Sequence, residues 1–228
     1  MVEKSNIKYI IGIDEVGRGP LAGPVAVCSF LMTEGSFVDG QFPTCQTCGK
    51  LSKLRDSKKL SKKQREEWFQ YLKVAKTLGL CDFAVSFVSP ENIDKFGIAK
   101  CIQKALNESL AKVTTQDYAN SLRFTLKGSD ATKNLHNPAA FHVFLDGGLK
   151  APAEYVNQET IIRGDELHPV ISLASIVAKV SRDAVMTKYA KDYPEYGFDK
   201  HSGYGTRAHY SAIKNHGQTP IHRKSFIH

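Results

Sequence analysis

The sequence predicts an α/β protein, in which strands and helices share one core. Short runs of apolar and β-branched residues, bounded by glycines, are typical of buried strands. They alternate with segments in which apolar residues recur every three or four positions, the spacing of one helix face. The 228 residues suffice for a single domain with a sizeable core. No apolar run approaches the roughly 20 residues needed to cross a bilayer.

Five segments are predicted to be strands. Residues 8–14 (KYIIGID) and 23–32 (GPVAVCSFLM) are joined by a glycine-rich run, which favours an antiparallel pair. Later apolar runs of the same character occupy residues 81–89, 141–148 and 159–165.

Three longer segments have helical periodicity. The first, 61–79, begins at the capping residue Ser61 and ends at Gly79. The second is 97–113. The third, 168–193, has a proline in its first turn and keeps apolar residues on one face along its length.

The charge of the chain is positive and unevenly distributed. Its formal net charge is +8. Residues 50–67 hold eight Lys and Arg against three acids, and residues 200–228 hold five Lys and Arg with no acid. A solvated face is the common explanation for one such run. Two runs, the second with Tyr204 and Tyr210 between its basic residues, favour a surface for a polyanion such as nucleic acid.

Cysteine usage and the N-terminus indicate the compartment. Five scattered cysteines do not suggest a disulfide framework, and the N-terminal apolar core is too short for a signal peptide. We therefore expect a reduced, cytoplasmic protein. Residues 33–55 are predicted to form a loop that contains Cys45 and Cys48. A zinc site there needs two further ligands, so an inert loop is favoured over zinc or a redox pair.

Acidic residues stand where apolar strands are predicted to stop. Asp14, Asp146 and Asp165 occupy such positions, and Glu15 follows the first of them. Each aspartate alone could simply form a turn. Together, four carboxylates at one sheet edge would repel one another unless a hard cation such as Mg²⁺ or Mn²⁺ lay between them. Two such ions could hydrolyse a phosphodiester.

The glycine-rich run after the first strand suggests close approach of a ligand. Gly17 and Gly19 have no Cβ, so a ribose 2′-hydroxyl could reach the backbone there. A tight hairpin explains the same glycines and is compatible with this reading. Residues 17–22 (GRGPLA) also fit a dinucleotide-binding fingerprint, but that motif requires a helix where a strand is predicted.

Seven motifs lie in order between residues 12 and 226. They are GIDEVGRGPLAGPV (12–25), DSKKLS (56–61), FLDGG (144–148), RGD (163–165), SLASIVAKVSRD (172–183), YGFDKHSGYGT (196–206) and TPIHRKSF (219–226). In these motifs the chain resembles bacterial ribonuclease HII. The resemblance implies a ribonuclease H-like fold, with a mixed central sheet flanked by helices and a small helical C-terminal region. It also implies one catalytic domain over residues 1–228, in which residues 194–228 form a small substrate-binding extension.

The resemblance further implies an activity and its residues. The activity is endonucleolytic cleavage 5′ to ribonucleotides, in RNA–DNA hybrids and at single ribonucleotides in duplex DNA, which leaves 3′-OH and 5′-phosphate ends. The implied ligands of two Mg²⁺ or Mn²⁺ ions are Asp14, Glu15, Asp146 and Asp165, the set suggested by the strand ends. The implied substrate contacts are Gly17, Arg18 and Gly19 at the ribose 2′-hydroxyl, Tyr204 at the RNA-to-DNA junction, and Lys58 at a phosphate.

Other functions account for fewer of these features. The sister class, ribonuclease HIII, carries an extra N-terminal domain, for which a motif beginning at residue 12 leaves no room. A binding protein without catalysis would keep the basic segments but has no use for four acids. We expect Arg182 and Asp183 to tie a surface together. We expect a monomer that binds RNA–DNA hybrids and ribonucleotide-containing DNA but no membrane, and a replication-clamp contact is not readable from the sequence.

Overall fold

The computed structural model describes residues 9–42, 51–54, 57–114 and 137–227. Cys45 and Cys48, and with them the zinc and redox alternatives, lie outside these residues. Cys28, Cys81 and Cys101 are buried free thiols. No helix in the described part of the chain is both long and apolar enough to span a membrane.

A mixed five-stranded sheet with the order β3-β2-β1-β4-β5 forms the centre of the described structure. β1 (Tyr9–Val16) pairs antiparallel with β2 (Val25–Thr33), as predicted, and β2 pairs antiparallel with β3 (Cys81–Val88). On its other side β1 pairs in parallel with β4 (Phe141–Asp146), which pairs in parallel with β5 (Gln158–Ile161). β1 is therefore central and buried on both faces.

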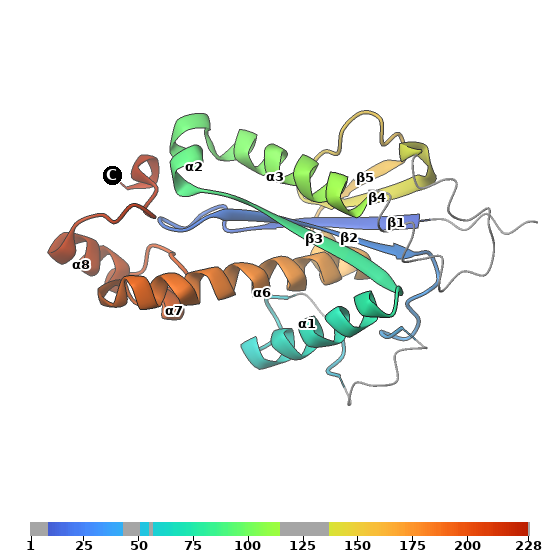
Figure 1. Ribbon diagram of the computed structural model, residues 1–228, viewed down its shortest axis with the longest axis horizontal. Helices are drawn as coiled ribbons and strands as arrows, with labels where there is room; N and C mark the ends of the chain where they lie inside the picture. Colours follow the sequence, from blue (N-terminus) through green and yellow to red (C-terminus); the bar gives the residue numbers. More distant parts are fainter. Residues whose placement is uncertain (1–8, 43–50, 55–56, 115–136, 228) are drawn as a thin grey trace, which may run out of the picture.

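Helices cover both faces of this sheet (Figure 1). One face packs against α3 (Ile98–Val113), which follows α2 (Pro90–Phe96). The other packs against α6 (Pro169–Asp192), beside which lies α1 (Lys62–Thr77). The pleat of β1 divides its side chains between the two layers. Ile11 and Ile13 join the cluster that includes α3, whereas Ile10 joins the cluster of α1 and α6.

Local sequence explains the helix starts. Ser61 and Gln64 form a reciprocal capping box at the start of α1. Pro169 opens α6, where its missing N–H costs no intrahelical bond. We did not predict α2, although Ser89 caps it and Pro90 is its first residue. That pair of residues is the signal that could have found it.

The C-terminal part of the chain packs on the far end of α6. It contains the short helices α7 (Phe198–His201) and α8 (Arg207–His216) and the 3-10 turns η2 (Pro194–Tyr196) and η3 (Lys224–Phe226). A small apolar cluster joins this region to α6 and to the loop after β1. Its buried members are Ala22, Met186, Tyr196, Phe198, Ala212 and Ile221.

Two expectations about strand ends are wrong. The strand predicted at 159–165 ends at Ile161, and Asp165 lies in the short helix α5 (Gly164–Leu167). The strand predicted to stop at Asp14 continues to Val16 because Glu15 and Val16 still pair with β2. Asp146 does end its strand. The dinucleotide-binding reading is also excluded, because a second strand, and no helix, follows the glycine-rich loop.

Candidate active site

The four predicted acidic residues come from three neighbouring segments. Asp14 and Glu15 lie on β1, and the parallel pairing of Ile13 with Leu145 brings the end of β4, with Asp146, beside them. Asp146 pairs with the last residue of β5, and α5 with Asp165 begins three residues later. The sheet register therefore gathers side chains that are about 150 positions apart in the sequence.

Each carboxylate of this acidic cluster has a partner in the protein. The Glu15 N–H donates to Asp14 Oδ1 (2.8 Å), and the Gly164 N–H donates to Asp146 Oδ1 (2.7 Å). The other two acids face basic side chains, and these pairs are Glu15 with Arg18 (3.7 Å) and Asp165 with the Lys58 ammonium (2.9 Å).

The electrostatics of the cluster are unfavourable to ionised carboxylates. Asp14 is only 6% exposed, and burial raises its pKa well above the ordinary value. The negative charges of the other three acids raise that pKa further, against a lowering hydrogen bond from Ser175. Burial and the charge of Asp146 likewise raise the pKa of Glu15, against the lowering effect of Arg18. A nearby cation would relieve this repulsion.

The acidic cluster has the chemistry of a site for a hard divalent cation. Its side chains are, however, bound to other groups of the protein and do not converge on one ion position. All four groups supply oxygen, the ligand that Mg²⁺ and Mn²⁺ prefer. Within the described residues, no three His, Cys, Asp or Glu side chains are already arranged around one ion position. Lys58 holds Asp165 and the Gly164 N–H holds Asp146. Enclosing an ion therefore requires these side chains to rotate.

The glycine loop, residues 17–24, is tightly packed at its first residue. Gly17 is buried, its φ is +89°, and a Cβ there would collide with the Arg182 side chain. Its missing side chain makes room for Arg182, as the tight-turn explanation of this glycine requires. Arg18 and Gly19 are exposed, and they form the open part of the loop.

Tyr204 lies against this open part. A Cβ on Gly19 would lie 4.0 Å from the Tyr204 ring, and Tyr204 is 46% exposed. The Leu21 N–H donates to the Gly203 carbonyl (2.8 Å), which joins the glycine loop to the turn that carries the tyrosine. The structure thus brings Tyr204 to the loop, whereas Lys58 lies at Asp165.

Two buried arginines beneath the loop were missed. We expected Arg182 and Asp183 to tie a surface together, but Arg182 is fully buried and so is Arg223. The sequence does carry a signal for Arg182. It stands midway between Ala178 and Met186, both buried, and four-residue spacing places all three on one helix face.

Comparisons with known proteins point to one family. Residues 11–228 match the family model described as Ribonuclease HII. The chain is 38% identical over 217 residues to a protein named Ribonuclease HII from Endomicrobium trichonymphae, which covers 95% of this chain and 84% of that protein.

Solved structures share the fold at low sequence identity. The structure of the PCNA:RNase HII complex from Archaeoglobus fulgidus aligns with a TM-score of 0.59 and 23% identity, over 96% of this chain and 95% of that one. Bst-RNase HIII in complex with Mn²⁺ aligns with a TM-score of 0.60 and 14% identity, over 98% of this chain and 68% of that one. Both are similar in the ribonuclease H-like fold.

Proposed function

The chain belongs to the ribonuclease HII family, whose members are metal-dependent ribonucleases of the ribonuclease H type, and we propose how it acts. It cleaves 5′ to ribonucleotides, in RNA–DNA hybrids and at single ribonucleotides in duplex DNA, leaving 3′-OH and 5′-phosphate ends. One observation carries this proposal: β1, which bears Asp14 and Glu15 of the acidic cluster, continues directly into an exposed loop edge beside a tyrosine. The first feature suits a scissile phosphate and the second suits the neighbouring ribose.

The acidic cluster is assigned to catalysis. Asp14, Glu15, Asp146 and Asp165 would hold two divalent ions, Mg²⁺ or Mn²⁺. Such ions supply a hydroxide nucleophile at neutral pH and stabilise the charge on the leaving oxygen. Lys58 stabilises the Asp165 carboxylate in the absence of substrate. Its ammonium, on a side chain that is 78% exposed, can then turn to a substrate phosphate.

The open part of the glycine loop is assigned to ribose recognition. The backbone N–H groups of Arg18 and Gly19 donate no hydrogen bond within the described part of the chain, so they are available to an oxygen acceptor. A 2′-hydroxyl offers such an acceptor, and DNA lacks it. The Tyr204 ring beside Gly19 provides an apolar surface for the sugar at the RNA-to-DNA junction. Gly17 belongs to the same proposed contact through its backbone, and its missing side chain lets Arg182 approach the loop.

The remaining assignments concern the whole chain. We propose that residues 1–228 act as one catalytic domain, that residues 194–228 serve as its substrate-binding extension, and that the protein works as a cytoplasmic monomer. The acid-free, basic C-terminal segment supports the second assignment, because phosphate contacts supply most of the affinity for nucleic acid. The Archaeoglobus fulgidus relative was solved with PCNA, which makes a sliding clamp a reasonable partner to test.

The test uses an end-labelled DNA duplex with one ribonucleotide, an all-DNA duplex, and Mg²⁺ or Mn²⁺. We expect one cut on the 5′ side of the ribonucleotide and none in the all-DNA duplex. Asp146→Asn should reduce the rate at least about 1,000-fold, because it removes a charged ligand from the ion site, and should still bind the duplex. Glu108→Gln is the matched control. Glu108 lies on α3, which is not one of the segments that carry the acidic cluster, so this variant should cleave normally. Cleavage of both duplexes, or full activity of Asp146→Asn, would refute the proposal.

A further inference from the structure

We infer that Arg182 and Arg223 are positioning residues that hold the glycine loop and the Tyr204 turn (residues 201–206) as one unit. Recognition of the ribose therefore depends on two guanidinium groups that are fully buried and cannot touch the substrate. The inference rests on the proposed function, because it concerns the same ribose contacts. It is carried by a set of hydrogen bonds that join segments far apart in the sequence.

Arg223 binds the carbonyls of the glycine loop. Its Nη2 donates to the Gly17 carbonyl (2.6 Å), and its Nη1 donates to the Arg18 carbonyl (3.0 Å). Its Nε and Nη2 both donate to the Gly23 carbonyl, at 3.0 and 2.9 Å. One planar group thus holds both ends of the loop. The Gly17 and Arg18 carbonyls both point at Arg223. Because a trans peptide directs its N–H opposite to its carbonyl, the N–H groups of residues 18 and 19 are turned away from Arg223.

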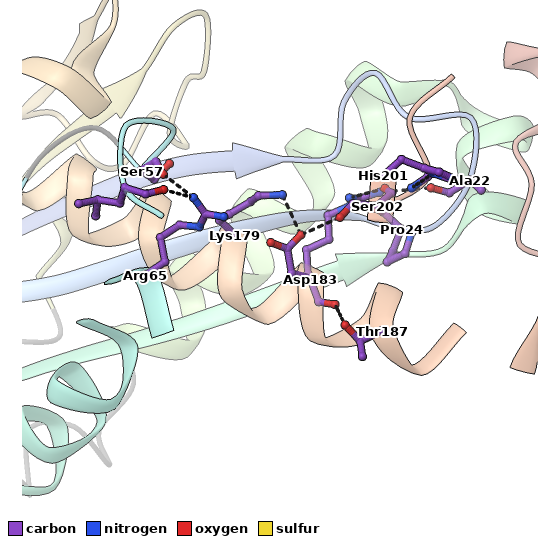
Figure 2. Close-up of polar contacts among 12 residues, drawn as sticks. Ala22, Pro24, Ser57, Arg65, Lys179, Asp183, Thr187, His201 and Ser202 are labelled. Atoms are coloured by element: carbon purple, nitrogen blue, oxygen red, sulfur yellow. Dashed lines mark hydrogen bonds and ion pairs between the residues drawn. The ribbon is translucent and has the colours of Figure 1, made fainter. Parts of the chain in front are cut away.

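Arg182 extends the same arrangement to the Tyr204 turn. Its Nε donates to the Pro24 carbonyl (2.9 Å), and its Nη2 donates to the Ala22 carbonyl (3.2 Å). Its Nη1 donates to the Ser202 carbonyl (3.0 Å). The hydroxyl of Ser202 donates to Asp183 (3.1 Å), so two adjacent residues of α6 hold the turn. Figure 2 shows Asp183 directed toward Ser202 and Lys179, with Ala22 and Pro24 close by.

Backbone hydrogen bonds complete the unit. Besides the Leu21–Gly203 bond, the Gly23 N–H donates to the Ile221 carbonyl (2.9 Å), and the Arg223 N–H donates to the Leu21 carbonyl (2.7 Å). The glycine loop is therefore bound on one side to the Tyr204 turn and on the other to residues 221–223. Gly19 and the Tyr204 ring keep a fixed separation only while these bonds persist.

The chemistry of the two arginines argues against a generic packing role. Neither forms an ion pair within the described residues, and all their acceptors there are backbone carbonyls. A buried charge without an ion-paired partner is costly, and the charges of Asp183 and Asp94 act on Arg182 and Arg223 only from beyond ion-pair distance. Burial lowers the pKa of Arg223 to about 9, and the neighbouring Arg182 charge contributes to that lowering. Apolar side chains would fill the same space without that cost, but they could not orient several carbonyls at once. The guanidinium group of arginine can orient several carbonyls because its N–H donors have a fixed, forked geometry.

The experiment measures ribose discrimination directly. Dissociation constants for the one-ribonucleotide duplex and the all-DNA duplex are compared in the Asp146→Asn background, where neither is cut. Arg223→Lys and Arg182→Lys keep the positive charge but replace the fork with a single ammonium. We expect the ratio of the two constants to fall at least about fivefold in each variant, while affinity for the all-DNA duplex changes less than twofold. In the catalytically intact background, kcat should fall more than KM rises.

Controls separate positioning from stability. Leu106→Ala, in the core on the α3 side, is a destabilised control that should lower the melting temperature and leave the ratio unchanged. Ser202→Ala removes only the Asp183 contact, so it serves as a milder variant should a lysine variant fail to fold, and it should lower the ratio about twofold. If the ratio of the two dissociation constants is unchanged in the folded arginine variants, this inference is wrong but the proposed function stands. Wild-type protein that binds both duplexes equally would overturn the proposed function, and this inference with it.

Discussion

Asp14 is both buried and close to other acids, and each property disfavours its ionised form in the absence of a cation. Its carboxylate is buried, and three further acids lie close enough to raise its pKa. The unfolded chain has no such penalty. Because the folded-state pKa is raised, ionising Asp14 costs folding free energy, and this cost develops as the pH rises through the ordinary value of 3.8. The residue is thus unfavourable for stability at neutral pH and is explained by its proposed role in ion binding.

We therefore expect Asp14→Asn to stabilise the metal-free protein while abolishing cleavage. Asparagine keeps the oxygen that accepts the Glu15 N–H but carries no charge. The melting temperature at pH 7.5 in EDTA should rise by about 2–4 °C, the shift expected for ~1 kcal/mol in a protein of this size. Thermal unfolding with and without Mn²⁺ checks this, and Mn²⁺ should raise the midpoint of wild-type protein far more than that of the variant. A lower midpoint in EDTA would contradict the argument.

At the scale of elements, the C-terminal helices are ordered by a chain of histidine hydrogen bonds. The Thr219 N–H donates to His222 Nδ1 (2.9 Å), so a neutral His222 carries its proton on Nε2 and donates to His209 Nε2 (3.0 Å). His209 then carries its proton on Nδ1 and donates to the Tyr204 carbonyl (2.9 Å). The backbone N–H at one end fixes both tautomers. A second proton on either ring would place two N–H groups against each other.

This arrangement predicts a specific acid sensitivity. Burial lowers the pKa of both rings, and the His209 neighbour contributes to bringing that of His222 to about 4. Since both folded-state values lie below the ordinary 6.5, the stability contribution is fully present above pH 6.5 and is lost as the pH falls from 6.5 toward 4. Melting temperatures between about pH 4.5 and 8 should show this loss in wild-type protein and a smaller one in His222→Gln. Parallel curves for the two proteins would refute the role of the histidines.

For the whole molecule, we propose that the distribution of positive charge decides how nucleic acid is held. The described part of basic segment 50–67 includes Lys58 beside the acidic cluster, and basic segment 200–228 carries Tyr204 beside the glycine loop. α3 lies on the other face of the sheet (Figure 1). Its Lys104 pairs with Glu108 four residues later (3.9 Å). The two basic segments thus each place a residue beside the acidic cluster or the glycine loop that we propose contact the nucleic acid, whereas Lys104 and Glu108 lie on α3.

Salt dependence of binding should reflect this distribution. Removing one lysine–phosphate interaction reduces the slope of log affinity against log salt by about one. In the Asp146→Asn background we expect Lys58→Ala to lower the slope by about one and Lys104→Ala to leave it unchanged. Fluorescence anisotropy at several salt concentrations measures both. An equal effect of the two substitutions would mean that Lys58 acts only through general charge.

The sequence by itself determined the main elements of this protein and its family. Apolar periodicity predicted the ends of the five strands and of the helices α1, α3 and α6 to within a few residues of their observed positions. It could do so because each element buries one face, and that face recurs in the local sequence. The adjacent Asp14 and Glu15, together with the motifs, indicated the family, which the comparisons confirm, and they suggested the acidic residues that we propose as the ion site. Residue type sufficed for these conclusions, since four carboxylates suit a hard cation wherever the fold brings them together.

Only the tertiary structure decided which groups face each other. It placed Asp165 in a short helix, filled the bare side of Gly17 with Arg182, and joined Arg223 to carbonyls some 200 residues earlier in the chain. No local pattern could show these contacts, because each depends on the sheet register and on the docking of the C-terminal region against α6. Local periodicity reports that a residue is buried, whereas its partner is set by how distant segments pack.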